Sequence, residues 1–301
     1  MYKHLFFDLD GTLINSYPRT LNAIKKIIKK HLGIDVSYEE LFIDAMVDLG
    51  YLFRKYGFPP SIFDELEEVF ASDTSLPELE AFEGVKEVLE LAKEKSMICN
   101  IYTNRNELTY KFLKDAGIDH YFSSYLLEAG KPSSQSLIDF LLENKISPKE
   151  CLVIGDRLLD IEGANGAGVD AFAINDYKKE EGAFFQGENA QELLKFLKIK
   201  KIKNVYVCMR NDFSKNRMNR LFTLLQNRGI NSKYLRIKEF CYQEEGSILI
   251  SDNKEIIDKA ASLNYITCGI NDTISYNKAN VIIKEESELI TIIDKLNSIG
   301  V

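Results

Sequence analysis

A short apolar run that ends in two aspartates and a glycine constrains this chain more than any other stretch. Residues 4–7 have the composition of a buried strand, and Asp8, Leu9, Asp10 and Gly11 follow it directly. Because side chains alternate along a strand, the two carboxylates can lie on one side of its carboxyl end. Open α/β sheets place their ligand sites at that end. The alternative interpretation is a β-turn in which the Asp and Gly residues only form the turn.

Two carboxylates this close together also predict a cation. They repel each other, and each raises the pKa of the other unless a positive charge lies between them. Mg²⁺ prefers oxygen ligands, so it is the ion that this pair favours. The motif is therefore a candidate metal site as well as a candidate strand end.

Two later turns carry residue types that bind phosphate. Thr103 and Asn104 come directly after the apolar residues 97–102 and before a helical pattern at residues 107–116. A hydroxyl and free backbone N–H groups at a strand-to-helix turn are good phosphate ligands. Lys131 precedes a further helical pattern, where its ammonium can act as a point charge on a phosphate. Taken singly, Thr103 could equally be a helix cap and Lys131 a solvated lysine.

The last of these strand ends adds two carboxylates. Residues 151–154 have the composition of a buried strand that leads into Gly155 and Asp156. Asp160 lies one helical turn after Asp156, on the same face. Asp156 alone would be interpreted as a helix N-cap. All of these polar groups together, each at the carboxyl end of a candidate strand, predict one shared site.

At these positions the chain resembles the haloacid dehalogenase superfamily of phosphatases. The resemblance covers roughly residues 1–175 and is closest to the phosphoglycolate phosphatase-like branch. Thr12 is the residue that the phosphatase members carry, which argues against the dehalogenases, and Arg157 stands where Ser or Thr is common, a tolerated departure. The four motifs are Asp8-Leu9-Asp10-Gly11-Thr12, Thr103-Asn104, Lys131-Pro132, and Gly155-Asp156 with Asp160.

The resemblance implies a mechanism that these residue types can perform. Asp8 would attack phosphorus and form an aspartyl-phosphate intermediate. Asp10 would protonate the leaving oxygen and then activate the water that hydrolyses the intermediate. Thr103, the backbone around Asn104, and Lys131 would hold the phosphoryl oxygens.

The resemblance also implies a metal site built from the same motifs. Mg²⁺ would bind the Asp8 carboxylate, the Asp10 backbone carbonyl, Asp156 and water molecules. Asp160 would orient Asp156 or a bound water.

The implied fold class is α/β, with a Rossmann-like doubly wound parallel sheet as the core. The catalytic core would span residues 1–15 and 83–200, and a small helical cap would be inserted at residues 16–82. Such a cap closes over the active site and excludes water. Within it, Tyr17 and Arg19 follow the first motif closely enough to touch the substrate. The helical patterns of the cap cover residues 18–32, 38–56 and 61–72.

The remaining residues, 204–301, predict a second, smaller C-terminal α/β domain. This domain is either a degenerate repeat of the core or an unrelated α/β unit of similar build. Residues 248–272 align without a gap onto residues 152–176, and seven of the 25 positions are identical. In this alignment Asp252 corresponds to Asp156, but an isoleucine corresponds to Asp160. No catalysis is therefore expected from this domain. Substrate sensing, a protein contact or oligomerisation are open roles. Its strand and helix patterns alternate over residues 205–209, 213–226, 233–237, 247–251, 254–263, 265–269, 281–284 and 288–299.

Composition favours an intracellular enzyme for small molecules. A net charge of −8 disfavours nonspecific binding to nucleic acid. No apolar run approaches the ~18 residues of a membrane span, and the N-terminus enters the first strand at once, so no signal peptide is expected. The five cysteines lack a metal-binding spacing and are expected to be reduced thiols in the cytoplasm.

Three function classes follow from these patterns. The first is a Mg²⁺-dependent phosphatase of a small phosphorylated metabolite, either a phosphoglycolate-like monoester or pyrophosphate. The second is a phosphate-sensing regulatory or binding protein built on a phosphatase core, and the third and weakest is a phosphomutase, whose cap must shield the aspartyl phosphate from water. The presence of Asp10 favours an enzyme, because a sensor has no need of an acid–base residue.

Overall fold

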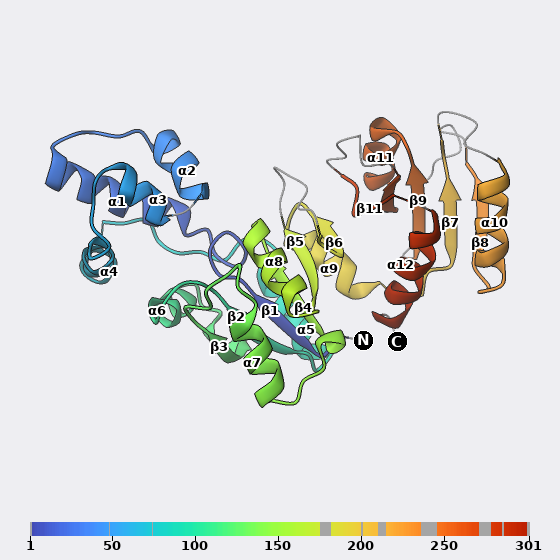
Figure 1. Ribbon diagram of the computed structural model, residues 1–301, viewed down its shortest axis with the longest axis horizontal. Helices are drawn as coiled ribbons and strands as arrows, with labels where there is room; N and C mark the ends of the chain where they lie inside the picture. Colours follow the sequence, from blue (N-terminus) through green and yellow to red (C-terminus); the bar gives the residue numbers. More distant parts are fainter. Residues whose placement is uncertain are drawn as a thin grey trace.

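The computed structural model has three parts that lie in a row: the helices of the expected cap, a central sheet with its helices, and a second sheet (Figure 1). No helix within the described residues is both long and apolar enough to cross a membrane. The described residues are 2–47, 49–73, 75–174, 182–199, 201–209, 215–235, 246–270, 278–284 and 286–299.

The central sheet is parallel and doubly wound. Its strand order is β3-β2-β1-β4-β5-β6, so the chain runs from β1 to one edge and then returns to β4 on the other side of β1. The point where the order reverses therefore lies between β1 and β4. The strands are β1 (His4–Phe7), β2 (Ile98–Tyr102), β3 (Phe122–Leu126), β4 (Cys151–Gly155), β5 (Asp170–Ile174) and β6 (Phe185–Gly187).

Helices cover both faces of this sheet because its strands are apolar on both faces. Leu5 and Phe7 of β1 belong to one buried cluster, which includes residues of α5 (Val85–Glu94), α6 (Leu108–Asp115) and α9 (Ala190–Lys198). Phe6, which points the other way, belongs to a second cluster with residues of α7 (Gln135–Glu143) and α8 (Leu158–Gly166). The expected Rossmann-like core is confirmed.

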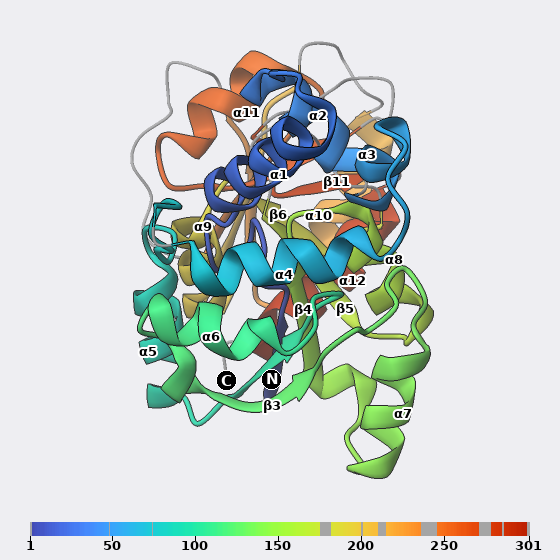
Figure 2. The same ribbon diagram turned by 90° about the vertical axis from the view of Figure 1, so that its left-hand side faces the viewer.

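The segment after β1 is helical, as expected for a cap. The pattern at residues 38–56 corresponds to two helices on either side of residue 48, which lies outside the described residues. Helix α4 lies beside α6 of the core (Figure 2). The ring centroids of Phe70 in α4 and Phe112 in α6 are 5.5 Å apart. The four helices are α1 (Tyr17–Leu32), α2 (Tyr38–Val47), α3 (Leu49–Lys55) and α4 (Ile62–Ser72).

The C-terminal region forms a second parallel sheet of order β11-β10-β9-β7-β8. This is the order of the central sheet with β3 left out, and β9 takes the place of β4. The aligned segments 248–272 and 152–176 accordingly begin on corresponding strands, although residues 175–176 and 271–272 lie outside the described ranges. The elements are β7 (Asn204–Val207), α10 (Lys215–Gln226), β8 (Asn231–Tyr234), β9 (Ser247–Ser251), α11 (Lys254–Ala261), β10 (Ile266–Ile270), β11 (Val281–Ile283) and α12 (Glu286–Ile299).

Specific contacts join this second unit to the edge of the central sheet. The backbone N–H of Gln186 in β6 donates to the carbonyl oxygen of Asn280 at 3.0 Å, and the Asn280 side chain donates back to the Gln186 carbonyl at 3.2 Å. Lys295 forms an ion pair with Asp170 at the start of β5. Ile202, in the connection between the two units, is fully buried. The second unit is therefore packed against the core.

Candidate active site

The exit of β1 places Asp8 and Asp10 at the carboxyl edge of the sheet. Asp8 is buried, and its backbone N–H continues the sheet by donating to the carbonyl oxygen of Ile154 at 2.9 Å. Gly11 has a positive φ of 84°, and a Cβ there would lie 2.3 Å from Oδ2 of Asp156. Glycine is thus favoured both by the backbone conformation and by the close approach of the Asp156 side chain.

The exit of β4 brings two further carboxylates to the same edge. Asp156 accepts a hydrogen bond from the Thr12 hydroxyl at 3.1 Å. Asp160, in the first turn of α8, is fully buried, and its Oδ2 accepts from the backbone N–H of Arg157 at 3.1 Å. A Cβ at residue 155 would collide with Asp160, so Gly155 is needed there. The site therefore lies at the switch point between β1 and β4, where doubly wound sheets bind their ligands.

Lys131 closes the site from the loop after β3. Its ammonium, which is inaccessible to solvent, donates to Oδ1 of Asp8 at 2.7 Å, to the carbonyl oxygen of Tyr102 at 2.9 Å, and to Asp160. The structure thus excludes a solvated lysine. A buried cation between two carboxylates fixes the direction of both.

Asn104 holds the Lys131 loop in place. Its side-chain oxygen accepts from the Lys131 backbone N–H at 2.7 Å, and its amide nitrogen donates to the Lys131 carbonyl at 3.0 Å. Both of these side-chain contacts of Asn104 are thus made to the backbone of Lys131. Thr103 is also buried, and its hydroxyl oxygen accepts a hydrogen bond from the backbone N–H of Arg105 at 3.2 Å.

Arg105 is a site residue that the sequence analysis does not single out. Its Nε donates to Oδ2 of Asp10 and its Nη2 to Oδ1, both at 2.9 Å. Ser16 also donates to Oδ1 of Asp10. Burial raises the pKa of Asp10, but the charge and hydrogen bonds of Arg105, with the Ser16 hydroxyl, outweigh it and hold this pKa below its ordinary value. The only sequence signal was the position of Arg105, directly after Thr103-Asn104.

The remaining carboxylates are under electrostatic strain. Burial, aided by the charges of Asp160 and Asp10, raises the pKa of Asp8 to about 6 despite the opposing effect of Lys131. Burial and the neighbouring Asp8 and Asp160 raise the pKa of Asp156 well above its ordinary value. These shifts show that burial and the like charges of the crowded acids outweigh the opposing charges of Lys131 and Arg157.

The donor set fits a hard divalent cation. Asp8, Asp156 and Asp160 each offer an oxygen, and these oxygens all lie within 4.8 Å of one another. Oδ2 of Asp8 is buried and has no hydrogen-bond partner among the described residues, whereas Oδ1 contacts Lys131. An all-oxygen set with one unsatisfied carboxylate oxygen is the chemistry that suits Mg²⁺.

Tyr17 and Arg19, the two residues of the expected cap that could touch the substrate, differ in where their side chains make contacts. Tyr17 is close enough to the site for Asp156, after burial, to raise the pKa of its phenol. Arg19 instead donates to the backbone carbonyls of Pro77 and Phe70, at 2.9 and 3.1 Å. Its terminal nitrogens are therefore used within the cap region.

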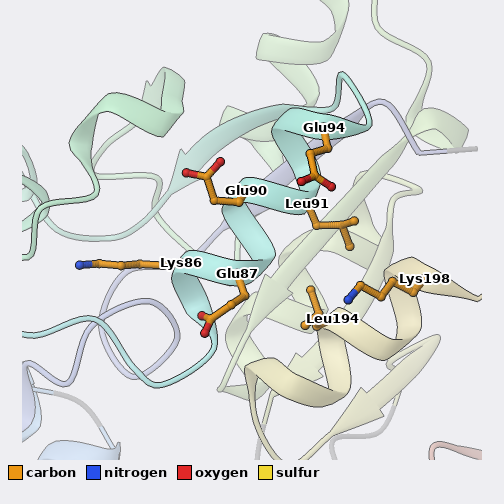
Figure 3. A pocket seen from close by; sticks show the side chains of 7 residues that line it. All are labelled: Lys86, Glu87, Glu90, Leu91, Glu94, Leu194 and Lys198. Carbon is orange, nitrogen blue, oxygen red and sulfur yellow. The ribbon is translucent and has the colours of Figure 1, made fainter.

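A surface pocket elsewhere on the molecule contains none of these residues. It lies between α5 and α9, and its lining consists of three glutamates, two lysines and a pair of leucines (Figure 3). None of the motif residues lines this pocket. We therefore assign the candidate site to the carboxyl edge of the central sheet. The lining residues are Lys86, Glu87, Glu90, Leu91, Glu94, Leu194 and Lys198.

Comparisons with known proteins match the part of the chain that contains this site. A family model described as haloacid dehalogenase-like hydrolase matches residues 5–174. Phosphoglycolate phosphatase of Mannheimia succiniciproducens is 29% identical over 192 residues, covering 58% of this chain and 85% of the relative. A proposed pyrophosphatase, PpaX, of Caldanaerobacter subterraneus is 28% identical over 212 residues, covering 64% of this chain and 94% of the relative.

Solved structures share the fold. A proposed β-phosphoglucomutase from Thermotoga maritima superposes with a TM-score of 0.52 at 21% identity, covering 66% of this chain and 99% of that one. CbbY from Rhodobacter sphaeroides, in complex with phosphate, gives 0.51 at 17% identity, covering 64% and 96%. These matches cover about two thirds of the chain, the length of the central sheet with its helical insert.

Proposed function

The chain belongs to the haloacid dehalogenase-like hydrolase family and is a phosphatase, and from that premise we propose that it hydrolyses a small phosphorylated metabolite with Mg²⁺ through an aspartyl-phosphate intermediate. The names of its relatives favour a phosphoglycolate-like monoester or pyrophosphate. The observation that carries the proposal is the state of Asp8. This carboxylate is buried at the switch point, with one oxygen held by Lys131 and the other without a hydrogen-bond partner in the part of the chain that the structure describes.

In the proposed first step, a carboxylate oxygen of Asp8 bonds to phosphorus as the bond from phosphorus to the leaving oxygen breaks. Asp10 gives that oxygen its proton. In the second step, Asp10 takes a proton from water, the water oxygen bonds to phosphorus, and the bond to Asp8 breaks to release inorganic phosphate. Thr103, the backbone N–H of Asn104, and Lys131 hold the phosphoryl oxygens throughout.

The carboxylates at this edge are proposed to hold the metal. The Asp8 carboxylate, the Asp10 backbone carbonyl and Asp156 would bind Mg²⁺, which would supply positive charge opposite the phosphoryl oxygens and the crowded acids. Asp160 supports them, because one of its oxygens holds Lys131 and the other holds the backbone N–H of Arg157. That backbone contact fixes the turn that carries Asp156.

The domain assignment is part of the proposal. We assign residues 1–15 and 83–200 to the catalytic core, residues 16–82 to the cap, and residues 204–301 to a domain without catalytic residues. Cys99, Cys151 and Cys268 are buried free thiols, which supports a cytoplasmic enzyme.

A screen of phosphate esters with Mg²⁺ tests the proposal. We expect turnover of 4-nitrophenyl phosphate and faster turnover of at least one metabolite, with loss of both in Asp8→Asn. Asp252→Asn is the matched control, because Asp252 occupies the corresponding strand end of the second sheet and should be dispensable. Absence of turnover by the folded wild-type protein, across all esters and with Mg²⁺ present, would overturn the proposal.

A further inference from the structure

The ion pair between Arg105 and Asp10 must open during the proposed reaction. Both oxygens of Asp10 accept hydrogen bonds from the guanidinium, and Oδ1 also accepts from Ser16. To act as an acid, Asp10 must carry a proton, and its hydroxyl oxygen is then a poor acceptor for the guanidinium. At least one of the two N–H···O bonds therefore has to break when substrate binds.

Arg105 itself is fixed from both sides. Its guanidinium carbon lies 4.4 Å from the ring centroid of Phe112 in α6 and 5.7 Å from that of Phe70 in α4. Only 12% of its side chain is exposed to solvent. When Asp10 moves, this guanidinium stays in a mostly dry site, and a shielded cation without an anion is costly. A new anion has to take the place of Asp10.

The surrounding loop indicates where that anion comes from. Arg105 directly follows the proposed phosphate-binding residues, and the next residue, Asn106, donates to the carboxylate of Glu67 in α4. The guanidinium thus lies between core and cap, next to the residue that serves the leaving oxygen. The leaving group of the substrate is the part that reaches this position.

We infer that Arg105 is a specificity-determining residue, which binds a second anionic group on the leaving-group side of the substrate and thereby releases Asp10. This inference rests on the proposed function and narrows it. The favoured substrates are phosphate compounds with a further carboxylate or phosphate close to the scissile oxygen. Neutral esters, which bring no second anion, leave Asp10 paired with Arg105 and react slowly.

The test compares wild type, Arg105→Gln and Arg105→Lys on four substrates with Mg²⁺. Ethyl phosphate and 4-nitrophenyl phosphate lack a second anion, phosphoglycolate carries a carboxylate, and pyrophosphate carries a phosphate. The measured quantity is the ratio of kcat/KM for each anionic substrate to that for ethyl phosphate. A charged hydrogen bond is worth about 1.5–3 kcal/mol, so Arg105→Gln should lower this ratio by about 10- to 100-fold. Arg105→Lys, which keeps the positive charge, should give a ratio between those of the wild type and Arg105→Gln. The anionic substrate with the higher kcat/KM tells whether the second group is a carboxylate or a phosphate.

Arg19→Gln is the matched control, because Arg19 is a second arginine whose contacts lie in the cap region. It should leave the ratio unchanged. An inhibition assay gives a readout that does not need turnover of these esters: phosphonoacetate should bind more tightly than methylphosphonate to the wild type, and Arg105→Gln should remove the difference.

Each other outcome overturns the inference. An equal loss on all four substrates in Arg105→Gln would mean that Arg105 only positions Asp10. A wild-type enzyme that turns over ethyl phosphate as well as the anionic substrates would refute the second-anion site but leave the phosphatase proposal standing. Absence of turnover on every substrate would instead refute the proposed function.

Discussion

Lys131 and Asp8 are 123 residues apart in the chain, yet Nζ of the lysine lies 2.7 Å from Oδ1 of the aspartate. Both side chains are buried, and the same ammonium also contacts Asp160. A cation from the loop after β3 thus orients the proposed nucleophile. Through Lys131, the residues that follow β1, β3 and β4 hold one another in place.

The first prediction concerns this lysine. Lys131→Met should abolish turnover and lower the free energy of unfolding at pH 7.5 by ~3–5 kcal/mol, because it leaves buried carboxylates without their cation. Urea denaturation measures the loss, and Lys149→Met, at an exposed lysine, should have no effect.

The loss should also depend on pH in a definite direction. Burial raises the pKa of Asp8 to about 6, above its ordinary value, and removal of Lys131 raises it further. A carboxyl whose pKa is higher in the folded state costs stability above that pKa and regains it as the pH falls. The deficit of Lys131→Met should therefore be smaller at pH 5 than at pH 7.5. A deficit that grows on acidification would contradict this account of Asp8.

The second prediction concerns the metal. Mg²⁺ should raise the melting temperature of the wild-type protein, since at 100 times its dissociation constant a ligand stabilises the folded state by about 2.7 kcal/mol. The shift should shrink below about pH 6, because protons compete for Asp8 and Asp156, whose pKa values are raised mainly by burial. Asp156→Ala should need more Mg²⁺ for the same shift. Full activity in EDTA would refute the metal site.

The third prediction separates the two aspartates of the first motif. Asp8→Asn should abolish hydrolysis while the protein stays folded, because an amide cannot form the acyl phosphate. Asp10→Asn should slow both chemical steps, by up to ~10²–10⁴. Burst kinetics with 4-nitrophenyl phosphate and circular dichroism check the two variants. Substantial turnover by Asp8→Asn would remove Asp8 from the role of nucleophile.

Local sequence was enough to predict the strand ends of this site, because each motif consists of an apolar strand and the residues that follow it. It was not enough for the pair of Arg105 and Asp10, which depends on how α4 and α6 place Phe70 and Phe112 around the guanidinium. It also gave no sign that the Asn104 side chain would be used on the Lys131 backbone. Both contacts come from packing between segments that are distant in sequence.

The same limit applies to the fold. The sequence predicts the alternating elements of residues 204–301 within a few residues, because each is an apolar run or an amphipathic helix. It predicted no strand at β3 or β6. The first is an edge strand with two central serines, and the second has only three residues, so neither has an apolar run long enough to identify.

The last prediction concerns the C-terminal unit. A chain that ends near residue 200 should keep its turnover of 4-nitrophenyl phosphate, because every proposed chemical residue lies at or before Asp160. It should melt at a lower temperature, since it loses the hydrogen bonds between Gln186 and Asn280 and the ion pair of Lys295 with Asp170. Calorimetry and a steady-state assay measure the two effects.

Lys295→Ala is the control for this truncation, because it removes the ion pair and leaves the rest of the unit. It should change the melting temperature only slightly, since a partly exposed pair is worth about 0–1 kcal/mol. A truncated protein that is folded but inactive would show that residues 204–301 hold the core or the cap in its working arrangement. An effect of Asp252→Asn on turnover would show that the second sheet still contributes to catalysis, and would favour the repeat interpretation over an unrelated unit.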